Sequence, residues 1–205
     1  AVTVRDSYPL IRCSDSLEAL GRGSYFSSLD MVSAYHQIPL AEASKPLTAF
    51  ASPTGGHFEF QRMPFGLTNA MSVFSRFSDT MLAQYKWDSC VCYVDDVLCF
   101  SPDIDTHLQD LDNILTCFSS FGARCAIKKS TFFAKELVFT GHLVSKEGVK
   151  PDPRNTAALR DMKLPGCVKD IQSFLGLTGY YRKHVRGYAT IAHPLQDAAR
   201  QGINV

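Results

Sequence analysis

The sequence lacks the features of a membrane, secreted or repetitive protein. Ser, Thr and Gly break its charge-free runs, so none is apolar enough to span a membrane, and we expect no membrane partner. No basic segment followed by an apolar one opens the chain, which argues against a secretory signal peptide. Internal repeats and low-complexity tracts are absent, which excludes solenoids and propellers. Because the first residue is Ala1 rather than Met, we expect a piece of a longer protein.

The cysteines form no Cys-x-x-Cys pair, and their number, seven, is odd. Four of them lie in strongly apolar stretches, where a free thiol behaves as a small apolar side chain. This pattern favours reduced cysteines in an intracellular protein over a disulfide framework. A zinc site stays open as the weaker alternative, because the spacing matches zinc motifs poorly.

Neither sign of charge dominates, since 21 Lys and Arg face 20 Asp and Glu among 205 residues. Residues 151–205, however, carry eight Lys or Arg and four Asp, a net charge of +4, which leaves −3 on residues 1–150. A basic lobe that binds along a polyanion, joined to an acidic lobe that binds metal, would have this distribution of charge. An ordinary solvated helical face explains the same charges, and charge alone favours that second interpretation.

Apolar residues make up 45% of the chain, which is enough for one substantial core and a small second lobe. In the first half, the pattern predicts a strand over residues 24–29, which ends at Asp30. It also predicts a β-hairpin within residues 47–60, turning at 53–56. Thr68 or Asn69 is expected to cap the next helix. The apolar face of that helix consists of Ala70, Phe74, Phe77, Met81 and Leu82.

In the second half, residues 90–100 form two apolar strands around Asp95 and Asp96. A helix is expected from about Ile104 until Gly122, and then a strand over residues 138–144 with Gly141 in its middle. A proline-containing, linker-like region comes before two further helices, which are predicted over residues 155–162 and 168–178. The order of elements predicts an α+β body with a helical C-terminal appendage.

The adjacent aspartates at a strand turn call for an explanation, because Asp disfavours strands and like charges repel. Asp30 follows another apolar strand, so Asp30, Asp95 and Asp96 would converge at one edge if the two strands were neighbours. Three carboxylates at one edge suit Mg²⁺ and two-metal phosphoryl transfer. Asp pairs are also common turn residues, and Asp after a strand is often only a cap, so that structural interpretation stays open.

Several ordered motifs carry a family resemblance. Tyr93-Val-Asp-Asp96 resembles the Y-x-D-D box of reverse transcriptases. The whole chain resembles the reverse transcriptase domain of gypsy-type LTR retrotransposon pol polyproteins, from Tyr8-Pro-Leu10 to His193-Pro-Leu195. The other landmarks are Phe26-Ser-Ser-Leu-Asp30, Ala34-Tyr-His-Gln-Ile38, Thr48-Ala-Phe50, Met63-Pro-Phe-Gly-Leu-Thr-Asn-Ala70, Phe139-Thr-Gly-His142 and Ser173-Phe-Leu-Gly-Leu-Thr-Gly-Tyr-Tyr-Arg182.

The resemblance implies an α+β right-hand polymerase with fingers, palm and thumb, whose fingers are truncated on the N-terminal side. Residues 1–149 would form the partial fingers and the palm, and residues 150–205 a thumb-like helical segment and the start of the connection. Within the first part, the palm would comprise about 21–36 and 66–149, and the fingers hairpin about 37–65.

The resemblance also implies an RNA-directed DNA polymerase, which transfers a nucleotide from a dNTP to a primer 3′-OH by two-metal catalysis. Two Mg²⁺ ions, for which Mn²⁺ can substitute, are the expected cofactors. The expected partners are an RNA or DNA template–primer duplex, dNTP, and the RNase H and integrase domains of a polyprotein. The expected location is intracellular, in cytoplasmic particles or in the nucleus.

The residues that match family motifs have implied roles. Asp30, Asp95 and Asp96 match the catalytic, metal-binding carboxylates, and Tyr35 matches the aromatic steric gate, although it could simply belong to the core. The other positions that match dNTP-binding residues are Met31, Val32, Ser33, Ala34, Phe65, Gly66 and Lys129. The match at Lys129 is weaker, because Ala126-Ile127 stands where relatives often have Asn-Pro.

Two further groups of residues match nucleic-acid contacts. Gly141 and His142 match the primer grip. Lys169, Gln172, Arg182 and Lys183 match the thumb, which follows the duplex backbone. We interpret His36 and Gln37 as structural residues near the gate.

Three alternatives to a polymerase remain, one of which is an inert fragment. The basic upstream fingers segment of the family has no counterpart before Ala1, which favours a catalytically incomplete or domesticated fragment that binds nucleic acid without polymerising. A palm-type nucleotide cyclase would share the sheet and the carboxylates, but it would not explain the grip and thumb motifs.

Overall fold

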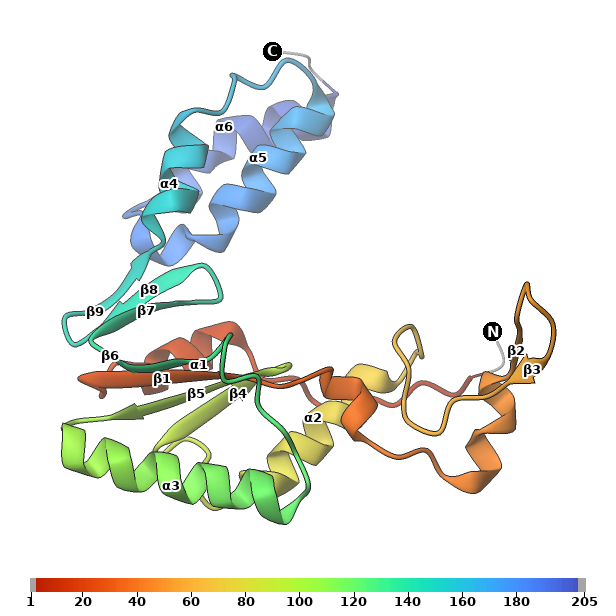
Figure 1. Ribbon diagram of the computed structural model, residues 1–205. Coiled ribbons are helices and arrows are strands. Elements are labelled where there is room, and N and C mark those ends of the chain that lie inside the picture. The colour runs from red at the N-terminus through yellow and green to blue at the C-terminus, as the bar shows by residue number, and fades with distance from the viewer. Residues whose placement is uncertain (1–2, 203–205) are drawn as a thin grey trace. The chain divides into compact units, whose positions relative to one another are not determined.

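The computed structural model describes residues 3–202, and the chain divides into two units (Figure 1). The first unit extends to Leu137 and includes Ser145–Gly148, and the second comprises Val138–Val144 and the chain from Val149 onward. The predicted assignment of residues 1–149 to fingers and palm, and of 150–205 to a thumb, stays a prediction.

An antiparallel sheet of four strands in the order β4-β5-β1-β6 forms the centre of the first unit. The strands are β1 (Tyr25–Asp30), β4 (Cys90–Tyr93), β5 (Asp96–Ser101) and β6 (Thr131–Ala134). β4 and β5 form the tight hairpin that carries Asp95, and β5 pairs with β1 along its whole length. The two apolar strands predicted on either side of the aspartate pair are therefore confirmed.

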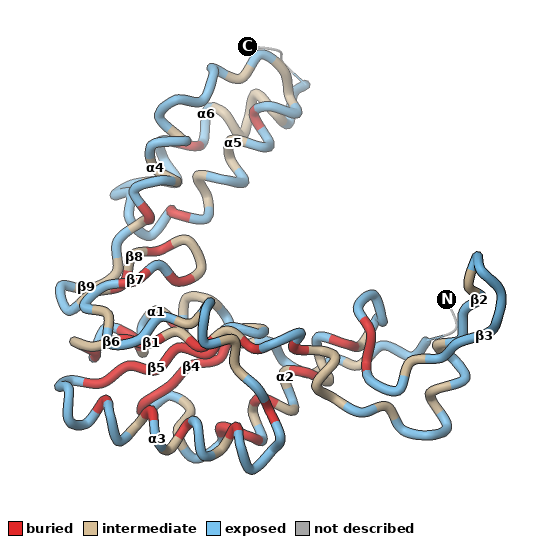
Figure 2. The backbone as a smooth tube through the Cα atoms, in the orientation of Figure 1, coloured by how far each residue is buried: buried red, intermediate tan, exposed pale blue. Residues whose placement is uncertain are grey.

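Three helices cover this sheet. They are α1 (Cys13–Leu20), α2 (Ala70–Met81) and α3 (Ile104–Ser120). Figure 1 shows α3 along one face of the sheet and α1 on the other. The buried side chains of α2 and α3 pack with Leu29, Val97 and Cys99 into one apolar core, which Figure 2 shows as the buried segments of β1, β4 and β5.

Helix α2 begins where the sequence predicted, but its cap is different. Asn69 stands at the cap position of α2, yet its side chain forms no capping hydrogen bond. Instead its Oδ1 accepts from the Asp6 amide at 3.1 Å, and its Nδ2 donates to the Val4 carbonyl at 2.9 Å. Asn69 thus ties the N-terminal segment to α2, and the predicted side-chain cap was wrong.

The segment between β1 and α2 contains the predicted hairpin. Its short strands β2 (Phe50–Ala51) and β3 (His57–Phe58) pair antiparallel, and the turn closes where the Ser52 amide donates to the Gly56 carbonyl at 3.0 Å. Before the hairpin, the chain forms 3-10 helices at Ala34–Gln37, Glu42–Ser44 and Pro46–Thr48.

The second sheet has the order β7-β8-β9. Its strands are β7 (Glu136–Phe139), β8 (His142–Ser145) and β9 (Gly148–Pro151). The predicted continuous strand over 138–144 was wrong, because Thr140 and Gly141, with φ of 45° and 75°, turn the chain between β7 and β8. Gly141 therefore serves a turn rather than a strand interior.

Three helices follow: α4 (Pro153–Arg160), α5 (Val168–Tyr180) and α6 (Tyr188–Gln201). α4 begins two residues earlier than predicted, because the Asp152 side chain caps it and Pro153 occupies its first turn. α6 was not predicted as a separate helix, since Pro194 interrupts its pattern. No helix within residues 3–202 is long and apolar enough to cross a membrane.

Candidate active site

Asp30 and Asp96 are paired residues at the ends of β1 and β5. Side chains that face each other across antiparallel strands leave the sheet on the same face, and here that face is opposite to the one that Leu29 and Val97 direct toward α2 and α3. Asp95 occupies the turn next to Asp96, after Val94 with φ of 58°. The register therefore brings the three predicted carboxylates to one edge.

Asp96 is within electrostatic influence of the other two carboxylates. Partial burial and then repulsion from Asp95 and Asp30 raise the pKa of Asp96. Two opposed aspartates without a cation are destabilising, because like charges face each other across the strands. Such a site gains free energy when a cation binds.

The donor set fits a hard divalent cation, because three carboxylates supply only oxygen ligands. A closed ligand cluster is not preformed, since no three His, Cys, Asp or Glu side chains between residues 3 and 202 lie close enough to hold a metal ion. The structure thus supplies suitable ligands at one edge without a finished coordination shell.

The turn after Asp30 is held against the loop that follows α3. The Asp30 amide donates to Ser130 Oγ at 3.2 Å, and its carbonyl accepts from the Ala126 amide at 2.8 Å. Met31 forms a β-bridge with Cys125, and Ser33 adopts a left-handed conformation with φ of 44°. These contacts fix the backbone that carries Asp30 and the residues next to it.

Tyr35 lies beside the carboxylates and also contributes to the core. Its ring packs edge-on against Phe65 and Phe74, with centroids 5.2 and 5.5 Å apart. Burial and then the charge of Asp95 raise the pKa of the Tyr35 phenol. Tyr35 therefore packs against Phe65 and feels the charge of Asp95, and its role as a gate stays a prediction.

The predicted grip turn is held by α4 and α5 within the second unit. Tyr181 Oη donates to the Gly141 carbonyl at 3.1 Å, and Asn155 Nδ2 donates to Tyr181 Oη at 2.8 Å. Tyr180 Oη donates to the Thr140 carbonyl, and the buried His142 ring packs against Tyr180 and Tyr181. Tyr181 is itself buried, so the turn is anchored from inside the unit.

Residues 2–144 match the family described as reverse transcriptase (RNA-dependent DNA polymerase). The chain belongs to the reverse transcriptase family. It is 39% identical over 97% of its length to the retrovirus-related Pol polyprotein from transposon opus, and 40% identical over 95% to that from transposon gypsy, both of Drosophila melanogaster. It spans about a fifth of these relatives, 20% and 19%.

Solved reverse transcriptase structures have the same fold. A foamy viral protease-reverse transcriptase in complex with RNA/DNA hybrid matches 97% of this chain with a TM-score of 0.83 at 23% identity, and the match covers 27% of that protein. A second foamy viral structure, in complex with double-stranded DNA, matches 96% with a TM-score of 0.83 at 25% identity and is covered to 35%. The predicted α+β polymerase fold is confirmed.

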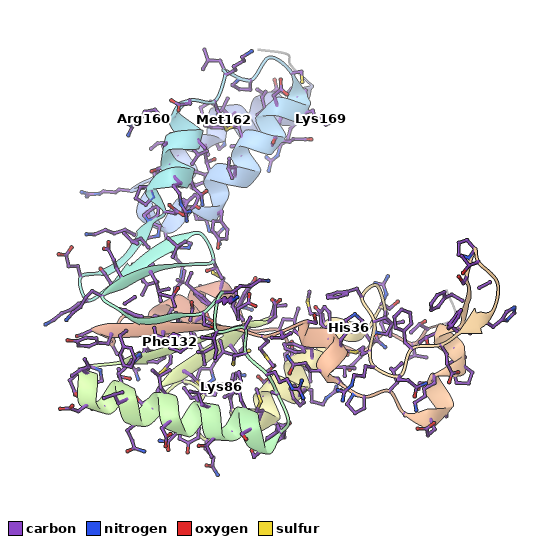
Figure 3. All side chains as sticks on the ribbon, viewed as in Figure 1. His36, Lys86, Phe132, Arg160, Met162 and Lys169 are labelled. Atoms are coloured by element: carbon purple, nitrogen blue, oxygen red, sulfur yellow. The ribbon has the colours of Figure 1, made fainter. Side chains whose placement is uncertain are left out.

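Other predicted site residues of this reverse transcriptase domain have exposed side chains. Lys129 is exposed, and its side chain forms no hydrogen bond or ion pair within the described part of the chain. The predicted backbone-contact residues, Lys169, Gln172, Arg182 and Lys183, are exposed on α5 and the turn after it, where Figure 3 labels Lys169. Their roles stay predictions.

The structure also reveals residues that sequence reasoning missed. Asn155 and Arg124 were not selected, and Gln37 was interpreted only as structural. The Gln37 side chain connects two segments of the reverse transcriptase domain that are 87 residues apart. The Tyr180-Tyr181 pair was part of the resemblance, but its hydrogen bonds to residues 40 positions away give no local signal.

Proposed function

We propose that this chain catalyses RNA-directed DNA synthesis, in which a primer 3′-hydroxyl attacks the α-phosphate of a dNTP and pyrophosphate leaves. The pairing of Asp30 with Asp96, next to Asp95 in the β4–β5 turn, is the observation that carries this proposal. Membership of the reverse transcriptase family supports it.

Asp30, Asp95 and Asp96 would hold two Mg²⁺ ions, or Mn²⁺ in their place. When bound, the ions neutralise the charge that develops on the attacking and leaving oxygens. Partial burial and then repulsion from Asp95 and Asp30 raise the pKa of Asp96, and a bound cation would relieve that repulsion, which supports this assignment.

The incoming dNTP would lie against Tyr35 and the backbone of residues 31–34, with Phe65 and Gly66 beside its sugar and Lys129 near its leaving group. The Tyr35 ring would oppose a ribose 2′-hydroxyl. The packing of this ring against Phe65 and the effect of the Asp95 charge on its phenol support that role.

The proposed nucleic-acid partner is an RNA or DNA template–primer duplex. Gly141 and His142 would position the primer end, and Lys169, Gln172, Arg182 and Lys183 would contact the backbone. The foamy viral relatives were solved with an RNA/DNA hybrid and with double-stranded DNA, which supports this class of partner. The Pol polyprotein relatives support a polyprotein context, in which RNase H and integrase domains and cytoplasmic particles stay predictions.

Primer extension on an oligo(dT)-primed poly(rA) template with Mg²⁺ tests the proposal. The double variant Asp95→Asn, Asp96→Asn should lose extension, because it removes two of the three charged ligands. Asp112→Asn, an exposed carboxylate on α3, is the matched control and should extend normally. Absence of extension by the unaltered chain, or extension that survives the double variant, would contradict the proposal.

A second candidate function is nucleic-acid binding without polymerisation, which the exposed cations of α5 and the following turn favour. Titration of a labelled RNA/DNA hybrid at two salt concentrations would detect it. A binding lobe must show a steep fall in affinity with salt, because phosphate contacts release counterions.

A further inference from the structure

The end of β1 is held by a single turn of the loop that joins α3 to β6 (Figure 1). The Asp30 amide donates to Ser130 Oγ at 3.2 Å, and the Ser130 hydroxyl donates to the Ala126 carbonyl at 3.0 Å. The Ala126 amide donates to the Asp30 carbonyl at 2.8 Å. These three hydrogen bonds form a closed ring that engages both the amide and the carbonyl of Asp30. We call this ring the Asp30 clamp.

The Asp30 clamp takes the place of a strand partner that β1 lacks at this point. β6 begins at Thr131, and its pairing with β1 ends at Ser28 after an irregular register. Asp30 therefore lies beyond the last pair with β6, and its amide and carbonyl are satisfied by the turn instead. The turn is itself closed, because the Ala126 carbonyl also accepts from the Ser130 amide at 3.0 Å.

The same geometry sets how Asp30 faces Asp96. β5 and β6 lie on opposite sides of β1, so the Asp30 amide and carbonyl, which bond to the clamp, are directed away from β5. Asp30 and Asp96 are therefore a non-hydrogen-bonded pair, in which Cα atoms are about 4.5 Å apart and side chains are closest. The clamp thus fixes the end of β1 where two like charges repel each other.

We propose that Ser130 is a positioning residue, whose hydroxyl holds Asp30 where its carboxylate can share a divalent cation with Asp96. This inference rests on the proposed function, because that reaction assigns the cation to these carboxylates. A hydroxyl suits the role because it accepts from the Asp30 amide and donates to the Ala126 carbonyl at the same time. Alanine at position 130 would leave both groups without this partner, whereas threonine would keep both hydrogen bonds.

The clamp is tested first without metal, by amide hydrogen exchange of the whole chain, measured by NMR in EDTA. Ser130→Ala should speed exchange of the Asp30 amide about five-fold, because that amide loses its acceptor, and Ser130→Thr should retain the protection. The matched control is Ser120→Ala, which removes a hydroxyl that donates to the Cys117 carbonyl at 2.8 Å, and it should leave exchange at Asp30 unchanged. Unchanged exchange in Ser130→Ala would overturn the proposal.

Metal binding is measured next, by electron paramagnetic resonance of Mn²⁺ titrated into the same chains without nucleic acid. Ser130→Ala should weaken Mn²⁺ binding about five-fold, while Ser130→Thr and Ser120→Ala should bind as the unaltered chain does. A residue that only stabilised the fold would lower the melting temperature and leave the Mn²⁺ affinity of the folded chain unchanged. That result would overturn the proposal, as would an unaltered chain whose Mn²⁺ binding is not weakened by Asp30→Asn.

Primer extension separates this inference from the polymerase proposal. Ser130→Ala should raise the Mg²⁺ concentration for half-maximal extension about five-fold, with a smaller change in the KM for dNTP, and Ser130→Thr should restore it. An unchanged Mg²⁺ requirement in an active Ser130→Ala chain would count against the positioning role. Absence of extension by the unaltered chain would contradict the polymerase proposal alone, because hydrogen exchange and Mn²⁺ binding still decide the role of Ser130.

Discussion

Asp30 and Asp96 stand directly opposite each other on β1 and β5, so two carboxylates of like charge share one face at one sheet edge. Like charges so placed cost stability in the absence of a cation, and repulsion from Asp95 and Asp30 adds to the partial burial that raises the pKa of Asp96. Neutralising one of these charges is therefore expected to stabilise the free protein.

Asp96→Asn should stabilise the metal-free protein at pH 7. Because the folded-state pKa of Asp96 is raised, its favourable contribution is complete below the unfolded pKa, near 3.9, and is lost as pH rises through the folded pKa. Removing the charge should raise the melting temperature by about 1–3 °C, the effect of one opposed like-charge pair in a chain of this size.

Differential scanning calorimetry in EDTA and then in Mg²⁺ would measure this effect. The variant should gain less from Mg²⁺ than the unaltered chain does, and Asp112→Asn should behave like the unaltered chain. A lower melting temperature for Asp96→Asn in EDTA would show that the two carboxylates do not repel in the fold.

Tyr181→Phe should impair the grip turn while the ring stays in place. The substitution leaves the Gly141 carbonyl and the Asn155 amide without their shared partner, a loss of about 1 kcal/mol. We expect the KM for template–primer to rise about five-fold with a smaller change in kcat, because one hydrogen bond that positions the turn is lost. Steady-state primer extension measures both constants.

The control is Tyr188→Phe, which removes a hydroxyl that contacts Thr178 Oγ1 at 2.9 Å in the same unit. It should leave the KM unchanged. Equal effects of both substitutions on KM would mean that Tyr181 acts only through the stability of the helices.

His107 should make folding stability depend on pH. Its buried ring bonds Ser27 Oγ through Nε2 at 2.7 Å and Ser101 Oγ through Nδ1 at 2.9 Å, and burial lowers its pKa although Asp110 opposes that shift. The neutral ring therefore stabilises the fold fully above the unfolded pKa, near 6.5, and that stability is lost as pH falls toward the folded pKa.

Urea unfolding at pH 7.5, 6.5 and 5.5 would measure the dependence. His107→Asn should lower the free energy of unfolding at pH 7.5 by about 1–3 kcal/mol, because buried hydroxyls lose a partner, and should flatten the fall below pH 6.5. His57→Asn, on the exposed strand β3, should leave the slope unchanged. A slope that His107→Asn does not alter would assign the pH dependence to other groups.

Tyr35→Val distinguishes a gate from a core residue. If the ring opposes a 2′-hydroxyl, its loss should lower discrimination between dNTP and rNTP by about 10²-fold, since a pocket rejects one added hydroxyl on roughly that scale. If Tyr35 only packs against Phe65 and Phe74, the variant should lose stability with unchanged discrimination. Competitive incorporation assays with matched dNTP and rNTP provide the ratio, and Tyr35→Phe is the control that retains the ring.

Local patterns were sufficient to predict β1, the β4–β5 hairpin, α2 and α3, because each has a clear periodicity with a turn or cap signal beside it. The turn at Thr140–Gly141 was missed because Thr rarely adopts the positive φ that it has here. α6 was missed because Pro194 normally ends a helix rather than lying inside it.

The convergence of the aspartates could be predicted only conditionally, on the assumption that their strands are neighbours. The contact between Gln37 and Arg124 could not be predicted at all, because the Gln37 side chain meets the Arg124 backbone across 87 residues. Such contacts depend on the folded path of the chain and leave no trace in residue spacing.

A side chain at Gly141 would crowd two neighbouring polar groups and strain the backbone. A Cβ at that position would lie 3.1 Å from Tyr181 Oη and 3.2 Å from Asn155 Nδ2, and φ is already 75°. At position 141 the hairpin therefore presents its backbone and no side chain. A change in the conformation of this turn would therefore require substitutions at Asn155, Tyr180 or Tyr181, because their side chains hold its backbone in place.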